Sequence, residues 1–237
     1  MTESEANSLL MSVEDLGFLS PEKTEMLLGA IAAMEPIKKR AAISKLTQTR
    51  VSAGGANLSS RDEAMMRLGM LPENIRQGLA QKRLQLADTN FYVVKAAGAL
   101  TTIKMITNAD TKSIGISNLA NGKLDKDNYL LLTHVRLTAG ISVIGALDAA
   151  YGVVGKEVVN GQVEFKNGTK YLLPNECGTK IFDTTGRTDV TVGTYRLANP
   201  KWLEPQQQLE FNLSLSQAAP ANTFLRVELI GSAVVPY

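Results

Sequence analysis

The chain has very few of the residues from which catalytic and metal centres are built. Its 237 residues include a single cysteine, Cys177, and a single histidine, His134. One cysteine excludes a disulfide within the chain, and one histidine excludes the multi-histidine metal centres that some enzymes place in β-barrels. His134 stands in the apolar stretch LLLTHVRL and Cys177 in the loop-like stretch PNECGT, so we interpret both as structural residues.

Motifs for phosphate and calcium are missing as well. The stretch GVVGKE ends like a phosphate-binding loop, but Glu157 stands where that loop needs Ser or Thr. Asp125 and Asp127 do not follow the twelve-residue spacing of a calcium loop. The sequence therefore predicts a protein that is not an enzyme and that uses no metal or other cofactor.

Long apolar runs and a leader sequence are also lacking. The longest candidate for a membrane span, residues 138–154, is interrupted by three glycines and Asp148 and falls short of the roughly 20 apolar residues that a span requires. The N-terminus is acidic and has no basic region before an apolar stretch. We expect no membrane span and no signal peptide, and a protein made in a reducing cytoplasm.

Aromatic residues make up only 5% of the chain, and their distribution divides it in two. Of the 12 Phe and Tyr residues only Phe18 precedes residue 90, whereas seven of the eight Met residues lie in the first 70. Methionine suits helices, and aromatic and β-branched residues suit strands. The sequence thus predicts a helical N-terminal segment, residues 1–88, and a β domain, residues 89–237.

The N-terminal segment is expected to form short helices. Ser20, Pro21 and Glu22 give the N-cap, first position and acidic first turn of a helix that runs to about residue 34. Further helices are predicted over residues 36–50, after Ser60, and over residues 72–87. Each of them is short and needs a partner surface to be stable.

From residue 90 the pattern changes to alternation with period two. It predicts about ten strands, over residues 90–97, 100–107, 128–139, 142–147, 162–166, 170–174, 179–182, 190–197, 208–216 and 224–235. Asn167-Gly168 between two of them predicts a hairpin with a type I′ turn. Eight to ten strands without a convincing helix indicate a sandwich or barrel.

Charge is segregated within the N-terminal segment. Residues 1–35 carry a net charge of −6 and residues 36–86 a net charge of +7, while the rest of the chain carries +1. One interpretation is that the basic segment contacts nucleic acid or an acidic neighbour. The other is that the two segments pack on each other or form solvated helix faces. The candidate contact residues are Lys38, Lys39, Arg40, Lys45, Arg50, Lys82 and Arg83.

The end of the chain carries a resemblance. Residues 199–237, NPKWLEPQQQLEFNLSLSQAAPANTFLRVELIGSAVVPY, give a Trp-Leu-x-Pro start, an amphipathic strand, a proline-containing turn and a last strand. This stretch resembles the closing strands of jelly-roll proteins of bacteriophage particles, and the resemblance extends at most over residues 90–237. It implies a mainly β fold, a jelly-roll-like antiparallel β-sandwich after a short-helix segment, and it transfers no functional residues. Apart from the resemblance, Trp202 is the sole Trp of the chain, and we expect it to anchor the core or an interface.

Two functions follow as hypotheses. The first is a structural virion protein, a capsid shell, vertex or capsid-associated subunit that assembles with copies of itself and with other virion proteins, and whose basic segment 36–86 contacts nucleic acid in one of the interpretations above. The alternative is a carbohydrate- or receptor-binding sandwich of a fibre or spike, in which Trp202, Tyr151 and Tyr195 are candidates to stack on sugars.

Overall fold

The computed structural model describes residues 64, 66–126 and 128–236. The helices predicted over residues 20–34 and 36–50 lie outside this range. Two short helical elements come first, the 3₁₀ turn η2 (Leu68–Met70) and the helix α5 (Glu73–Ala80). Eight strands follow, together with the short helices α6 (Lys156–Val159) and η3 (Thr179–Phe182): β1 (Leu84–Ala96), β2 (Thr102–Ile106), β3 (Tyr129–Ile141), β4 (Gln162–Asn167), β5 (Lys170–Gly178), β6 (Thr194–Leu203), β7 (Leu209–Ser214) and β8 (Thr223–Pro236).

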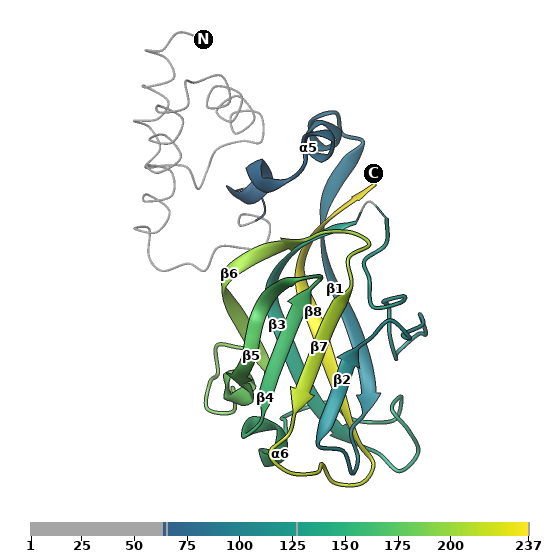
Figure 1. Cartoon of the computed structure of the whole chain (residues 1–237), viewed down its shortest axis with the longest axis vertical. Helices are drawn as coiled ribbons and strands as arrows, with labels where there is room; N and C mark the ends of the chain where they lie inside the picture. The colour runs from purple at the N-terminus through teal and green to yellow at the C-terminus, as the bar shows by residue number, and fades with distance from the viewer. Residues whose placement is uncertain (1–63, 65, 127, 237) are drawn as a thin grey trace. The chain divides into compact units, whose positions relative to one another are not determined.

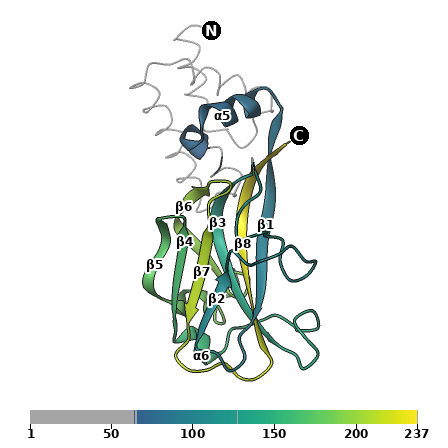
Figure 2. The same ribbon diagram turned by 45° about the vertical axis from the view of Figure 1, so that its right-hand side comes forward.

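The strands form two antiparallel sheets of four strands each, with the orders β1-β8-β3-β6 and β2-β7-β4-β5. Figures 1 and 2 show the two sheets stacked face to face, with the loops at the end of β3 and the helix α6 at the end opposite to α5. The predicted fold class, a mainly β sandwich after short helices, is confirmed by this arrangement.

The pairing of the strands is nested. The first strand pairs with the eighth, the second with the seventh, the third with the sixth and the fourth with the fifth. The pairs β3·β8 and β4·β7 then join neighbouring parts of each sheet. Neighbours in each sheet therefore come from distant parts of the chain, apart from β4 and β5.

The core lies between the two sheets. Its largest fully buried side chains include Phe165 and Phe211, whose ring centres are 5.3 Å apart in a tilted arrangement, and Phe182, which meets the edge of Tyr195 at 6.2 Å. Aliphatic residues from both sheets fill the remaining space. This burial, together with the ladder hydrogen bonds, is the main source of stability for a sandwich.

A second, smaller apolar cluster holds α5 against the sheet. Leu71 and Ile75 are buried with Val234 of β8, and they are surrounded by partly buried residues that include Leu84 and Trp202. A glycine, Gly78, stands on the same helix, where a β-carbon would lie only 2.6 Å from Leu84. A larger residue at position 78 would therefore require the side chain of Leu84 to move.

The predicted helix over residues 72–87 is too long. The helix ends at Ala80, the backbone turns at Lys82 with a φ of 57°, and β1 begins at Leu84. The chain changes to a strand here because Leu84 and Leu86 face the second cluster while the backbone pairs with Pro236 and Val234. The change from helix to strand thus precedes the predicted boundary at residue 88.

Two predicted strands are also wrong, and a third is displaced. Residues 142–147 form a loop and residues 179–182 form η3, whereas the strand expected from residue 190 begins at Thr194 and continues to Leu203. A short apolar run predicts a strand, but it forms one only where a neighbouring strand is free to pair with it. Neither of the first two segments pairs in this way. Gly193, with a φ of 75°, ends the loop that precedes β6.

The predicted hairpin is confirmed, but its turn differs from the expected one. Asn167 pairs with Lys170, so the two turn residues are Gly168 and Thr169. Only Gly168 has a positive φ, 57°, which fits a type II′ turn, since a type I′ turn needs two positive φ angles. Asn167 stays in the strand because it also pairs with Leu209. The sequence pair Asn121-Gly122 does have two positive φ angles, 52° and 60°.

Replacing Gly168 by valine should destabilise the sandwich by about 1–3 kcal/mol, because a β-branched residue is strained at a φ of 57°. Urea denaturation of the full chain measures the loss. The matched control is Thr169→Val at the neighbouring exposed turn residue, whose φ is not positive and which should change stability by less than about 0.5 kcal/mol. Equal stabilities of the two variants would contradict the strained-turn account.

Candidate functional site

Two of the seven predicted polyanion-contact residues belong to the described part of the chain. Lys82 and Arg83 are exposed in the turn between α5 and β1. Outside the described residues lie the other five, Lys38, Lys39, Arg40, Lys45 and Arg50. The contact with a polyanion or an acidic neighbour stays a prediction.

Trp202 lies in β6, on the outer side of the first sheet. Its ring is partly buried in the second apolar cluster, and its Nε1–H donates a 3.1 Å hydrogen bond to the carbonyl oxygen of Arg67. Trp202 therefore links the segment before α5 to the sandwich, on the side of the sheet away from the main core.

The two tyrosines considered for sugar stacking also contact the protein itself. Tyr195 packs against the main core beside Phe182. The hydroxyl of Tyr151 donates a 2.7 Å hydrogen bond to the carbonyl oxygen of Ala146, and its ring faces Arg226. The three candidate rings therefore lie in three separate places: Tyr195 against the main core, Tyr151 beside Arg226, and Trp202 in the second apolar cluster.

The lone histidine and cysteine have ordinary surroundings. His134 is half-buried in β3, with its Nδ1 2.9 Å from the hydroxyl of Thr133. Cys177 in β5 packs partly buried against the main core. Within the part of the chain that the structure describes, no three His, Cys, Asp or Glu residues come together as metal ligands would.

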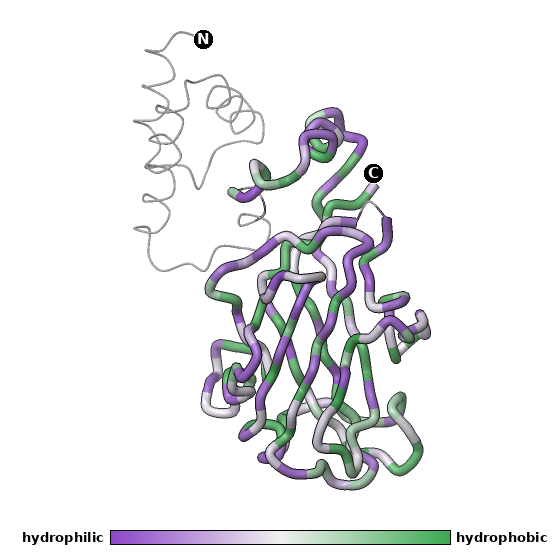
Figure 3. Tube along the Cα trace, viewed as in Figure 1, coloured by the Kyte–Doolittle hydropathy of each residue, from purple (hydrophilic) through white to green (hydrophobic). Residues whose placement is uncertain are grey.

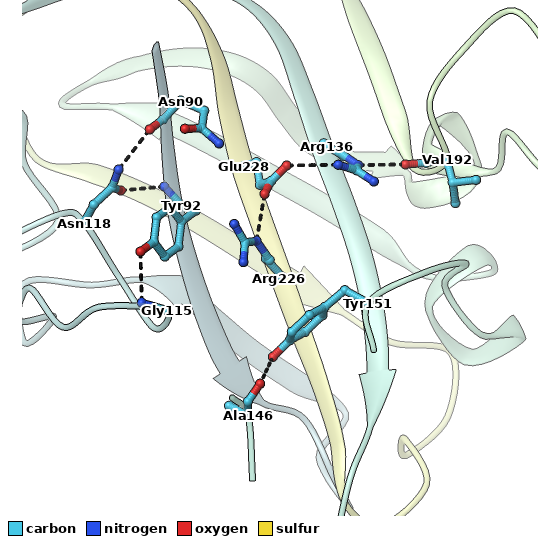
Figure 4. Close-up of polar contacts among 10 residues, drawn as sticks. All are labelled: Asn90, Tyr92, Gly115, Asn118, Arg136, Ala146, Tyr151, Val192, Arg226 and Glu228. Atoms are coloured by element: carbon cyan, nitrogen blue, oxygen red, sulfur yellow. Dashed lines mark hydrogen bonds and ion pairs between the residues drawn. The ribbon is translucent and has the colours of Figure 1, made fainter. Parts of the chain in front are cut away.

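A cluster of charged and aromatic residues lies on the outer face of the first sheet, and Figure 4 shows it. At its centre is Arg226 of β8. Its guanidinium lies 4.5 Å from the ring centre of Tyr92 and 5.9 Å from that of Tyr151. Its Nε donates a 2.7 Å hydrogen bond to Glu228. The cation thus has an aromatic ring on two sides and a carboxylate on a third.

Glu228 is shared between two arginines. Its side chain is 10% exposed, and it also accepts a 3.4 Å hydrogen bond from Arg136 of β3. Arg136 in turn donates a 3.0 Å hydrogen bond to the carbonyl oxygen of Val192 in the loop before β6. The cluster has one carboxylate and two guanidinium groups, so it carries a net positive charge, and each charge has a partner.

Burial shifts the pKa of one titratable group of the cluster, the hydroxyl of Tyr151. Removal from water raises the pKa of the Tyr151 hydroxyl, and the nearby positive charge of Arg226 opposes this rise. The phenol therefore stays protonated at neutral pH and continues to donate to Ala146.

The two tyrosines connect Arg226 to two surface loops. The hydroxyl of Tyr92 accepts a 3.1 Å hydrogen bond from the backbone N–H of Gly115, which lies in the loop between β2 and β3. The same loop runs along the edge of β1: Asn118 accepts from the N–H of Tyr92 and donates to the carbonyl oxygen of Asn90. Tyr151 holds the other loop, between β3 and α6, through Ala146.

Exposed aliphatic side chains lie on these two loops and at Ile141, the last residue of β3. We call this set the apolar loop surface, and it consists of Ile114 (97% exposed), Ile141 (66%), Val143 (84%), Ile144 (80%), Leu147 (73%) and Val153 (50%). Figure 3 shows hydrophobic residues in the loop below the end of β3. The two loops touch, since a β-carbon on Gly115 would lie 2.5 Å from Leu147.

Sequence reasoning missed both the Arg226 cluster and the apolar loop surface. A signal for the first was present, because Arg226 and Glu228 alternate with Leu225, Val227 and Leu229 and must face away from the core. The second was hidden because residues 142–147 were interpreted as a buried strand.

No family model matches the chain, and no curated protein sequence is significantly similar to it. Among the described residues, no helix has the length and apolar character to cross a bilayer.

Replacing Trp202 by alanine should cost about 2–3 kcal/mol, less than for a fully buried Trp, because its ring is only partly buried. Trp202→Phe keeps most of the apolar contact and loses the bond to Arg67, so it should cost about 1 kcal/mol. Urea denaturation gives both values, and hydrogen exchange over residues 73–80 should rise most in the alanine variant. Unchanged exchange and a loss below about 0.5 kcal/mol would contradict this role.

Replacing Arg226 by alanine should cost about 2 kcal/mol, because it removes the stack on two rings and leaves the nearly buried Glu228 with Arg136 alone. Hydrogen exchange should also rise in residues 142–151. Arg226→Lys keeps the charge but loses the planar contact and should show about half the effect. Equal exchange in all three proteins would show that Arg226 does not hold the loops.

Proposed function

We propose that this chain is a non-enzymatic structural subunit of a virus particle, a capsid shell, vertex or capsid-associated protein. In this proposal it is made in the host cytoplasm, becomes part of the virion, and acts through repeated contacts with copies of itself and with other virion proteins. The proposal is carried by the nested pairing of the eight strands taken together with the exposed aliphatic side chains on the loops.

Nested pairing has a simple physical meaning. When an antiparallel ribbon with β1·β8 at one end and β4·β5 at the other is rolled up, the pairs β2·β7 and β3·β6 follow in between. Rolling brings β3 beside β8 and β4 beside β7, which gives the two observed sheets. This supports the assignment of the sandwich as a jelly roll of the kind found in viral capsids, lectins and cupins.

Fold alone does not decide among these uses. The surface of the sandwich favours assembly, because six of the ten exposed large hydrophobic residues of the described part lie on two neighbouring loops and at the end of β3. Exposed aliphatic side chains gathered in this way mark contact with other macromolecules more often than recognition of a polar sugar. The candidate sugar-stacking rings, in contrast, contact the protein itself.

Two outer strands carry features that discourage uncontrolled pairing with other chains. The edge strand β5 contains Pro174 and a bulge at Glu176, where φ is 68°. The edge strand β6 is displaced from β3 between Arg196 and Lys201, a stretch that includes Pro200. Since such irregularities make these edges poor templates, contacts between subunits are expected on loops and faces instead.

The basic segment, residues 36–86, fits the proposal as the part that contacts nucleic acid or an acidic neighbouring subunit. Of the seven candidate contact residues, Lys82 and Arg83 belong to the described part of the chain, and both are exposed and available for such a contact.

Assembly of the purified full chain tests the proposal. Light scattering over a range of concentrations, with negative-stain imaging of the same samples, should show defined oligomers or closed shells that form cooperatively as the concentration rises. A strict monomer at every concentration and at both low and high salt would overturn it. Binding to a glycan array by such a monomer would favour the carbohydrate-binding alternative.

A further inference from the structure

The apolar loop surface is the part of the described molecule with the strongest physical reason to be covered. Val143 and Ile144 are adjacent in the chain and are 84% and 80% exposed, and Ile114 on the other loop is 97% exposed. A loop with no partner gains nothing from such side chains in water, where small polar residues are the usual choice.

Internal hydrogen bonds give the loop between β3 and α6 a fixed shape. The hydroxyl of Ser142 accepts from the backbone N–H groups of Ile144 and Gly145, at 3.1 and 3.3 Å, and donates to Asp148 at 3.0 Å. The Tyr151–Ala146 bond closes the far side of the loop. A surface that is already ordered loses little conformational entropy on binding. Less of the free energy gained by burying its apolar area is then spent on ordering the loop.

The charge of these loops limits the kind of partner. Residues 141–153 contain one charged residue, Asp148, and residues 113–118 contain none. The nearest basic side chain of the β2–β3 loop, Lys112, is paired with Asp125, so this surface offers little attraction to nucleic acid or to anionic lipid. A nearly neutral surface also escapes the like-charge repulsion that would oppose contact with the same surface of another copy.

The size of the surface is also suitable. Six aliphatic side chains, each at least half exposed, present an apolar area on the order of 500 Å², at the upper end of what a monomer leaves open. Each partner of a stable complex contributes about 800 Å², so these side chains would supply more than half of one partner's share.

We propose that the apolar loop surface is a contact between copies of this chain, with Arg226 as the residue that positions its two loops through Tyr92 and Tyr151. This inference rests on the proposed function and identifies where the subunits meet. Its partner is a second copy, because apolar contact between identical surfaces needs no complementary charge.

The experiment compares the full chain with the double variant Val143→Asp, Ile144→Asp. Buried in a contact between copies, these carboxylates would be desolvated and would repel each other, so the concentration at the midpoint of assembly should rise at least tenfold. The matched control is Tyr171→Asp, which introduces a carboxylate at a residue that is 48% exposed on β5, outside the two loops. Its midpoint should change less than twofold.

A second pair of measurements keeps the test decisive if the double variant folds poorly. Val143→Ser, Ile144→Ser removes the apolar surface without adding charge, and thermal unfolding checks that each variant is folded. Assembly of folded double variants at the wild-type midpoint would overturn this inference and leave the proposed function standing. A wild-type chain that never assembles would overturn both. Flotation of the wild type, but not of the aspartate variant, with uncharged lipid vesicles would replace the second copy by a membrane as the partner.

Discussion

Strand β8 pairs with β1 on one side and with β3 on the other along almost its whole length. Its alternation defines two surfaces at once, since Leu225 and Val227 enter the core while Arg226 and Glu228 face outward. A shift by one residue would place both charges between the sheets, at a cost far above the stability of a domain of this size. This register therefore fixes the core, the Arg226 cluster and the loops that depend on it.

Arg226 shows how a charge can be tolerated on a partly covered sheet. Its side chain is 26% exposed, and the loss of hydration is offset by Glu228 and by the faces of two tyrosine rings. A planar guanidinium can stack on rings and bond to a carboxylate at the same time, which the compact ammonium of lysine does less well. The same contacts hold two surface loops, so a polar cluster determines the shape of an apolar surface.

The proposed function depends on the irregular edges of β5 and β6 together with the open loops. Prolines and bulges make strand-to-strand association unfavourable at these two edges, while the aliphatic side chains on the loops favour contact at one end of the sandwich. A subunit of a regular assembly needs such a restriction, because association along sheet edges has no natural end point.

The sequence by itself determined the class of fold. The aromatic and β-branched composition after residue 90 predicted a mainly β domain, and the alternation over residues 224–235 marked β8 with its inner and outer faces. These signals are local, because side-chain periodicity follows directly from backbone geometry.

Only the tertiary structure decided where apolar runs remain exposed, as in residues 142–147, since a run of this kind is a strand only if another strand pairs with it. The turn at Gly168 and Thr169 depended on the pairing of Asn167 with Leu209, 42 positions away. The Arg226 cluster likewise joins β1, β3, β8 and a loop, and only the register of the whole sheet brings these segments together.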